Sequence, residues 1–273
     1  MQALPQAAFF LLLEAAVGGT IALFWVHLRG EVGRGFTLFT GVCLLVFALL
    51  AVWLRSAFPP LVSPDVDPTA SLWFAVERAL SFAFLVALTV YLLGLRAQAW
   101  TIITRPIGTL VPLLGLASLW AAALVAPSPQ LLGLGTPLAV LAGAMALGSA
   151  LVGLSLGHWY LVSPTLSVKP LIQVTFLCLG ALVTQSILLP LLLFVPGPSR
   201  QGVQQLFSEY LVFFGVRIVF GLLVPLIATI MAWRTARIRS LDSATGLLYI
   251  VAALILAGEI SARTLFFLTG VAT

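Results

Sequence analysis

Long apolar runs, separated by short polar or proline-rich segments, constrain this sequence more than any other feature. A helix that crosses a bilayer needs about 20 mostly apolar residues, and eight stretches of the chain meet that requirement. Their predicted ranges are 7–28, 36–55, 71–95, 107–126, 131–157, 171–195, 205–233 and 244–269. Only 8% of the residues are charged, whereas soluble domains carry roughly a quarter. The sequence therefore predicts an all-α polytopic membrane protein with eight transmembrane helices.

The distribution of basic residues predicts how this bundle is oriented. Eight of the 13 Lys and Arg residues fall in the connections after the first, third, fifth and seventh helices, and two fall in the other connections. The eight are Arg29, Arg34, Arg96, Arg105, Lys169, Arg234, Arg237 and Arg239, and the two are Arg55 and Arg200. Because short cytoplasmic loops are enriched in Lys and Arg, both termini are expected to face outward. The net charge of +5 follows from these loops, so we expect a lipid bilayer and no nucleic acid as a partner.

Similar motifs at matching places predict an internal repeat. F-W-V-H-L at 24–28 ends the first predicted helix, and G-H-W-Y-L at 157–161 ends the fifth. The predicted division is into two four-helix halves of the same orientation, 1–127 and 128–273, within one membrane domain.

Ionisable residues inside the apolar runs are the candidate functional residues. Glu259 and Arg263 lie four positions apart, which places them on one face of the last helix. A charge within hydrocarbon is costly and is by default a functional candidate. The predicted topology places five further ionisable residues in the same outer half of the bundle, namely Glu14, Glu77, Arg78, Glu209 and Arg217.

These residues predict a site near the outer face that binds a polar ligand head and exchanges protons. Glu14 or Glu259 would accept protons, while Arg78 and Arg217 would keep them ionised or bind a carbonyl oxygen. Gln185 and Ser186 are expected to donate hydrogen bonds to the same cavity. The alternative is a set of interhelical ion pairs, or side chains that extend from helix ends to the interface.

Two histidines offer a different cofactor. His27 and His158 end corresponding helices of the two halves, and together they would supply the two axial ligands of one b-type haem. The alternative is a pair of interfacial histidines bonded to loop carbonyls or water. No other metal site is predicted, because Cys43 and Cys178 are far apart and an iron–sulfur cluster needs about four thiolates.

Two stretches resemble a known family. They are L-L-L-E-A-A-V-G-G at 11–19 and G-E-I-S-A-R-T-L-F-F at 258–267. With eight helices and outward termini, the chain resembles the membrane-anchor subunits of the dimethyl-sulfoxide-reductase and polysulfide-reductase type. Those anchors have a glycine-rich first helix and a late helix with an acidic residue followed by Arg and Phe.

The resemblance implies an integral subunit of a respiratory complex in a bacterial-type cytoplasmic membrane. The subunit would bind quinone, as menaquinone or ubiquinone, and exchange protons and electrons with an iron–sulfur subunit beside a catalytic subunit. It implies that the proton acceptors are Glu14, Glu77 and Glu259, and that the ring oxygens are oriented by Arg78, Arg217 and Arg263.

Three alternatives remain open from the sequence. The first is the haem-b cytochrome that uses His27 and His158. The second is a small transporter or proton-translocating module, since internal repeats and intramembrane Glu and Arg are typical of transporters. The third is an anchor that tethers a redox enzyme without quinol chemistry.

Overall fold

The helices account for nearly the whole of the described chain. The computed structural model describes residues 3–60, 67–97, 101–163, 165–194, 197 and 200–273, apart from the side chains of 101–103 and 105. The helices are α1 (Ala3–Arg29), α2 (Arg34–Ala57), α3 (Pro68–Ala97), α4 (Thr101–Val125), the 3₁₀ helix η1 (Gln130–Gly133), α5 (Gly135–Val162), α6 (Lys169–Phe194), α7 (Arg200–Ser208), α8 (Leu211–Gly215), the π-helix η2 (Val216–Leu223), α9 (Val224–Arg237) and α10 (Leu241–Thr269). Within the described residues, eight helical segments are long and apolar enough to cross a membrane. The prediction of an all-α polytopic membrane fold is confirmed.

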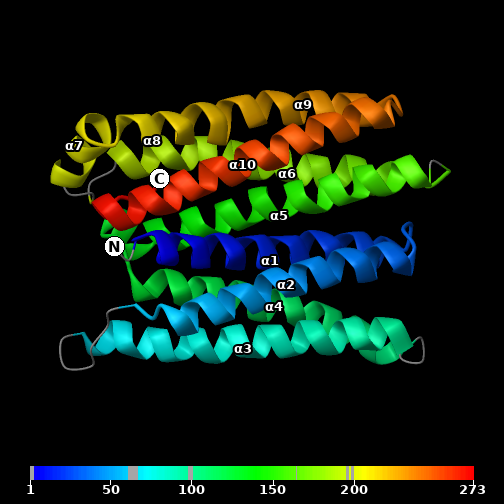
Figure 1. Ribbon diagram of the computed structural model, residues 1–273, viewed down its shortest axis with the longest axis horizontal. Coiled ribbons are helices and arrows are strands. Elements are labelled where there is room, and N and C mark those ends of the chain that lie inside the picture. Colours follow the sequence, from blue (N-terminus) through cyan, green and yellow to red (C-terminus); the bar gives the residue numbers. More distant parts are fainter. Residues whose placement is uncertain (1–2, 61–66, 98–100, 164, 195–196, 198–199) are drawn as a thin grey trace.

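The spanning helices lie side by side, and both termini lie at the same end of the bundle (Figure 1). We call this the terminal end. The opposite end carries the connections that follow α1, α3, α5 and α9, where the basic residues are concentrated, and we call it the basic end.

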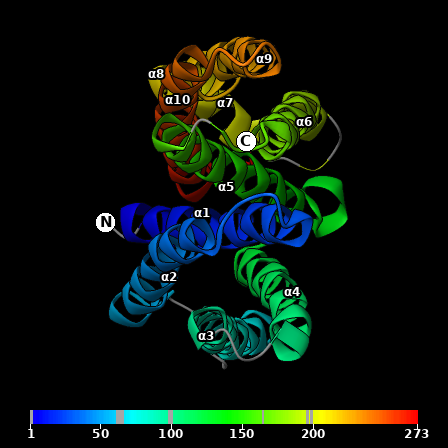
Figure 2. The ribbon, with the colours of Figure 1, turned by 90° about the vertical axis from the view of Figure 1, so that its right-hand side faces the viewer.

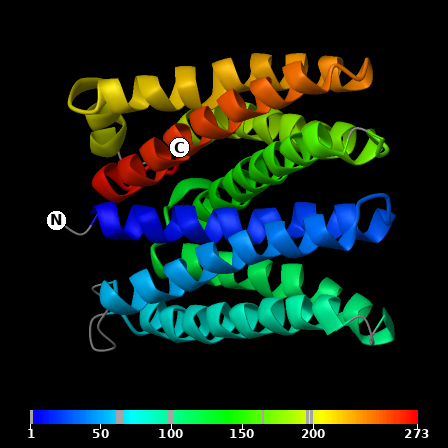
Figure 3. The same ribbon diagram turned by 45° about the vertical axis from the view of Figure 1, so that its right-hand side comes forward.

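α1 and α5 occupy the centre of the bundle, with α2, α3 and α4 on one side of the pair and α6, α9 and α10 on the other (Figures 2 and 3). α1 packs against α2 and α4, and α3 contacts both of these. In the same way, α5 packs against α6 and α10, and α9 contacts both. Between the sets, α1 contacts α10 and α4 contacts α5. The helix contacts therefore follow one scheme in the two predicted halves.

The central pair is held backbone to backbone by small residues. A Cβ atom added to Gly18 of α1 would lie 1.7 Å from the carbonyl oxygen of Ala144 in α5. A Cβ atom added to Gly148 would lie 2.0 Å from the carbonyl carbon of Gly18. Membrane helices use small residues at such crossings because close backbone approach gains van der Waals contact where no hydrophobic effect operates.

The seventh spanning segment begins later than the sequence predicted. The prediction of 205–233 is corrected to Leu211–Arg237, and the short helix α7 (Arg200–Ser208) precedes it. The difference covers 205–210, where Gln205, Ser208 and Glu209 interrupt the apolar sequence and α7 ends before α8 begins at Leu211. Glu209 lies at the break between the two helices and is exposed, so its predicted place inside a spanning helix is wrong.

A π-helical segment at the start of this span adapts it to a proline. Pro225 has no N–H to donate, and its ring crowds the carbonyl group of Gly221, four residues earlier. The backbone from Val216 to Leu223 is π-helical, and such segments are frequent at functional sites. A Cβ atom on Gly258 of α10 would lie 2.2 Å from the Cα of Gly221, so the two backbones touch here as well.

Replacing Gly148 with Ala tests the central crossing. The added methyl group must push α5 away from α1, which is expected to lower the free energy of unfolding by about 1–3 kcal/mol. Reversible unfolding of the purified protein in mixed detergent micelles measures this. Gly180→Ala is the matched control, because a Cβ atom there meets nothing within 4 Å and Ala favours helix. Equal stability of the two variants would contradict the backbone contact.

Candidate functional site

Buried charges gather in two groups in the half of the bundle nearest the terminal end. The first, which we call the four-charge cluster, consists of Glu14, Arg217, Glu259 and Arg263. The second is the ion pair between Arg55 and Glu77.

Glu259 is the centre of the four-charge cluster. Its Oε1 atom accepts hydrogen bonds from Nη1 of Arg217 at 3.0 Å and from Nε2 of Gln185 at 2.7 Å. Its Oε2 atom accepts one from Nη2 of Arg263 at 3.1 Å. One carboxylate therefore joins α6, η2 and α10.

Arg263 extends the cluster to the two central helices. Its Nε atom lies 2.7 Å from Oε1 of Glu14 in α1, and its Nη2 atom donates to the carbonyl oxygen of Ala139 in α5 at 3.0 Å. The room for these groups comes from Gly143. A Cβ atom there would lie 2.6 Å from both Nη2 of Arg263 and Oε2 of Glu259.

The cluster is almost completely enclosed and balanced in charge. Glu14 and Glu259 are 0% exposed, Arg263 is 1% exposed and Arg217 is 2% exposed. Two carboxylates face two guanidinium groups, so the cluster carries no net charge when all four are ionised. Glu14 Oε2, Arg217 Nε and Gln185 Oε1 have no hydrogen-bond partner among the described residues. The described residues therefore leave part of the cluster's hydrogen-bonding capacity unused.

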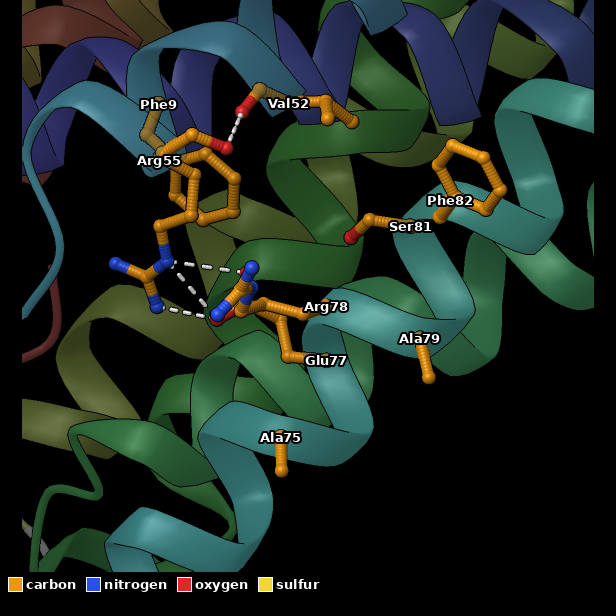
Figure 4. Close-up of a pocket in the computed structure, with 10 residues that line it drawn as sticks. Phe9, Val52, Arg55, Ala75, Glu77, Arg78, Ala79, Ser81 and Phe82 are labelled. Carbon is orange, nitrogen blue, oxygen red and sulfur yellow. Dashed lines mark hydrogen bonds and ion pairs between the residues drawn. The ribbon is translucent and has the colours of Figure 1, made fainter.

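The second group lies closer to the terminal end, between α1, α2 and α3. Nε of Arg55 donates to both carboxylate oxygens of Glu77, at 3.0 and 2.9 Å, and Nη2 of Arg55 pairs with Oε2 (Figure 4). Nη1 donates to Oε1 of Gln6, whose Nε2 atom donates to the carbonyl oxygen of Phe58 at 3.0 Å. The guanidinium group also lies 4.3 Å from the ring centroid of Phe9. A forked Arg–carboxylate pair of this kind is strong and directional.

A cavity of about 580 Å³ adjoins this pair, within the usual range for small-molecule sites. α1, α2 and α3 line it through ten residues, namely Phe9, Val52, Arg55, Ser56, Ala75, Glu77, Arg78, Ala79, Ser81 and Phe82 (Figure 4). Arg78 is exposed, in contrast to the enclosed Glu77 beside it. The cavity thus combines a paired carboxylate, a second cation and aromatic surface.

The sequence-predicted residues divide between the two groups, where one shared site was expected. Glu14, Arg217, Glu259 and Arg263 meet in the four-charge cluster, and Gln185 joins them as predicted for a donor. Glu77 and Arg78 lie instead at the cavity on the other side of α1. Arg78 and Arg217 therefore lie in different groups.

Three further predictions differ from the structure. Ser186 donates to the carbonyl oxygen of Leu182 at 2.8 Å, within its own helix, and takes no part in the cluster. Glu209 lies outside both groups. Arg55 was assigned to a connection, yet it lies in the last turn of α2 and is 5% exposed. In the sequence, a basic residue at the end of an apolar run cannot be distinguished from a loop residue. The buried ion pair of Arg55 becomes evident only from its contact with Glu77, 22 positions away.

The two histidines lie against different neighbours. His27 meets the ring of Tyr91 in α3 edge to face, with ring centroids 5.9 Å apart. Nδ1 of the exposed His158 lies 3.4 Å from the hydroxyl group of Tyr249 in α10. The described residues contain no group of three His, Cys, Asp or Glu side chains arranged to hold a metal ion. The haem alternative stays a prediction.

Comparison of the chain with protein-family models and with curated proteins found no match in either case. The evidence for function is therefore the residues and geometry of the two buried groups.

Replacing Glu259 with Gln tests the four-charge cluster. Two guanidinium groups would then face the single carboxylate of Glu14, and breaking a buried ion pair in this way costs about 3–5 kcal/mol. The measurement is again the free energy of unfolding in mixed micelles. Glu209→Gln is the control, because that carboxylate is exposed, and a change within about 0.5 kcal/mol is expected.

A double variant distinguishes the contribution of the Arg217–Glu259 ion pair from a general loss of stability caused by each substitution. Glu259→Gln combined with Arg217→Gln removes one charge of each sign, so it should be destabilised by less than the sum of the two single losses. Additive losses would show that the two residues are not coupled.

Proposed function

We propose that this protein is the quinol-interacting membrane subunit of a respiratory electron-transfer complex. The supporting observation is the cavity beside Arg55 and Glu77, which lies within the membrane-spanning part of α1, α2 and α3 and has the volume of a small-molecule site. The head of a quinol is a flat ring with an oxygen at each end, and its tail is soluble in lipid. Such a molecule matches a cavity that offers aromatic side chains, a carboxylate and two guanidinium groups.

The proposed chemistry assigns a role to each polar residue of the cavity. Oxidation of a quinol releases two protons and two electrons. Glu77 accepts one of the two protons from a ring hydroxyl group, the other proton leaves to water at the terminal end of the bundle, and Arg78 donates a hydrogen bond to a ring oxygen. Arg55 keeps a partner throughout, because Gln6 holds its Nη1 atom independently of Glu77. The electrons leave to an iron–sulfur partner, since the chain has only two cysteines, far apart in sequence.

We assign the four-charge cluster a supporting role. Its members are enclosed and bonded to one another, so Glu14, Glu259, Arg217 and Arg263 are not placed to meet a ligand in the cavity. They hold α1, η2 and α10 in register. This revises the expectation that Glu14 and Glu259 accept protons directly.

The wider setting is part of the same proposal. An iron–sulfur subunit and a catalytic subunit would lie beside this chain in a bacterial-type cytoplasmic membrane. The basic connections favour outward termini, which would place the cavity in the outer half of the bilayer. The support is the resemblance of 11–19 and 258–267 to anchor subunits, together with the charge asymmetry of the loops.

A proton-translocating module is the second candidate. The shared contact scheme of the two helix sets and the buried charges between them favour it, because transporters often place ionisable groups at the interface of repeats. Reconstitution of the purified chain alone into proteoliposomes distinguishes the two. Proton or solute movement without a redox partner would favour the module.

Glu77→Gln tests the proposed quinol chemistry. Loss of the proton acceptor is expected to lower quinol-dependent turnover in membranes by about a hundredfold, within the usual range for general acid–base catalysis. Glu209→Gln, an exposed carboxylate outside the cavity, should leave turnover unchanged.

Arg78→Ala provides the second measurement, because Glu77→Gln also disturbs the ion pair with Arg55. Arg78 is exposed and forms no ion pair among the described residues, so the variant should fold normally. The expected result is a fall of about tenfold in kcat/KM for quinol, equivalent to one hydrogen bond to a ligand oxygen. Unchanged kinetics in both variants would contradict the proposal.

A further inference from the structure

A second crevice lies at the basic end of the bundle, between α1, α6 and α9. It is a cavity of about 430 Å³ lined by Ile21, Trp25, Ile172, Gln173, Phe176, Leu177 and Trp233. Apart from Gln173 and the two indole N–H groups, this lining is wholly apolar. Its position and composition differ from those of the cavity beside Glu77.

The crevice continues along the bundle. A cavity of about 480 Å³ between α5 and α6 shares Phe176 and Leu177 with it and extends to Thr184. From Gln173 to Thr184, the helix rises about 16 Å at 1.5 Å per residue. One leaflet of a bilayer has about half of the 30 Å hydrocarbon thickness. The combined groove thus has the length of one acyl chain.

Cations stacked on tryptophans flank the polar end of the groove. The guanidinium carbon of Arg29 lies 4.9 Å from the ring centroid of Trp25. That of Arg237 lies 4.8 Å from the ring centroid of Trp233. Both tryptophans line the cavity. Tryptophan prefers the level of the lipid head groups, so these two cations lie where a phosphate group would be.

A third basic residue belongs to the same end of the groove. Lys169 begins α6 one turn before Gln173, and this spacing places the two residues on one helix face. Each of the three helices that line the crevice therefore carries a basic residue in its terminal turn. By sequence, the connections at this end hold eight basic residues and only two acidic ones, Glu31 and Asp242.

We infer that this crevice is a binding site for one anionic phospholipid. Arg29, Lys169 and Arg237 hold the phosphate group, and one acyl chain lies along the groove past Phe176 towards Thr184. Charge complementarity selects an anionic head group, since basic pockets between membrane helices bind such lipids. The inference is independent of the proposed quinol chemistry, because the two cavities share no lining residue.

Native mass spectrometry of the purified protein tests the inference. The probes are dioleoyl-phosphatidylglycerol and dioleoyl-phosphatidylcholine, which differ only in the head group. A preference of about tenfold for phosphatidylglycerol is expected. The double variant Lys169→Gln/Arg237→Gln leaves only Arg29 at the head-group end and should sharply reduce this preference. Arg34→Gln/Arg96→Gln removes two exposed basic residues from α2 and α3, which line neither cavity of the groove, and should retain it.

Gly180→Leu tests the acyl-chain part of the site. Gly180 lines the second cavity and a Cβ atom there meets nothing within 4 Å, so the variant should fold while its side chain fills the groove. Bound phosphatidylglycerol is expected to fall by about tenfold. Equal binding of the two lipids would overturn the inference, and so would equal effects of the two double variants or unchanged binding to Gly180→Leu.

Discussion

The cost of an uncompensated charge in hydrocarbon governs this structure. The carboxylate of Glu259 compensates two guanidinium groups at once, those of Arg217 and Arg263. Its hydrogen-bond donors come from α6, η2 and α10, and small residues around it leave the space for them. Gly143 leaves space for its carboxylate, while Gly221 and Gly258 bring η2 against α10. The π-helical turn and the glycines are thus local features whose common effect is to close one network of ion pairs.

The apolar pattern was sufficient to predict the helices, because span length depends on bilayer thickness and not on tertiary contacts. The prediction failed at the start of the seventh span, where the amphipathic helix α7 directly precedes an apolar segment. Hydropathy alone does not reveal the break in the helix at Glu209. The position of the charged residues along the bundle axis could also be predicted. Four of them were expected in one half of the bundle and lie together there, namely Glu14, Arg217, Glu259 and Arg263.

Lateral grouping could not be predicted in the same way. Periodicity says which face of a helix a residue occupies but not which helix it faces. Glu77 and Arg78 were therefore grouped with Glu14, although α1 separates the two sites. Arg55 was missed for a related reason, since its place at a helix end resembled that of an interfacial cation until its contact with Glu77 was known. Orientation and the division into halves stay predictions.

The crossing of Gly18 with Gly148 has a consequence for access to the molecule. Two helices in backbone contact leave no width for a hydrocarbon tail, so the bilayer cannot enter between α1 and α5. Apolar molecules must reach the protein from its rim, where one cavity opens near the terminal end and another near the basic end. Ligands of the two cavities would enter from opposite leaflets of the bilayer, so the binding of one would not obstruct the entry of the other.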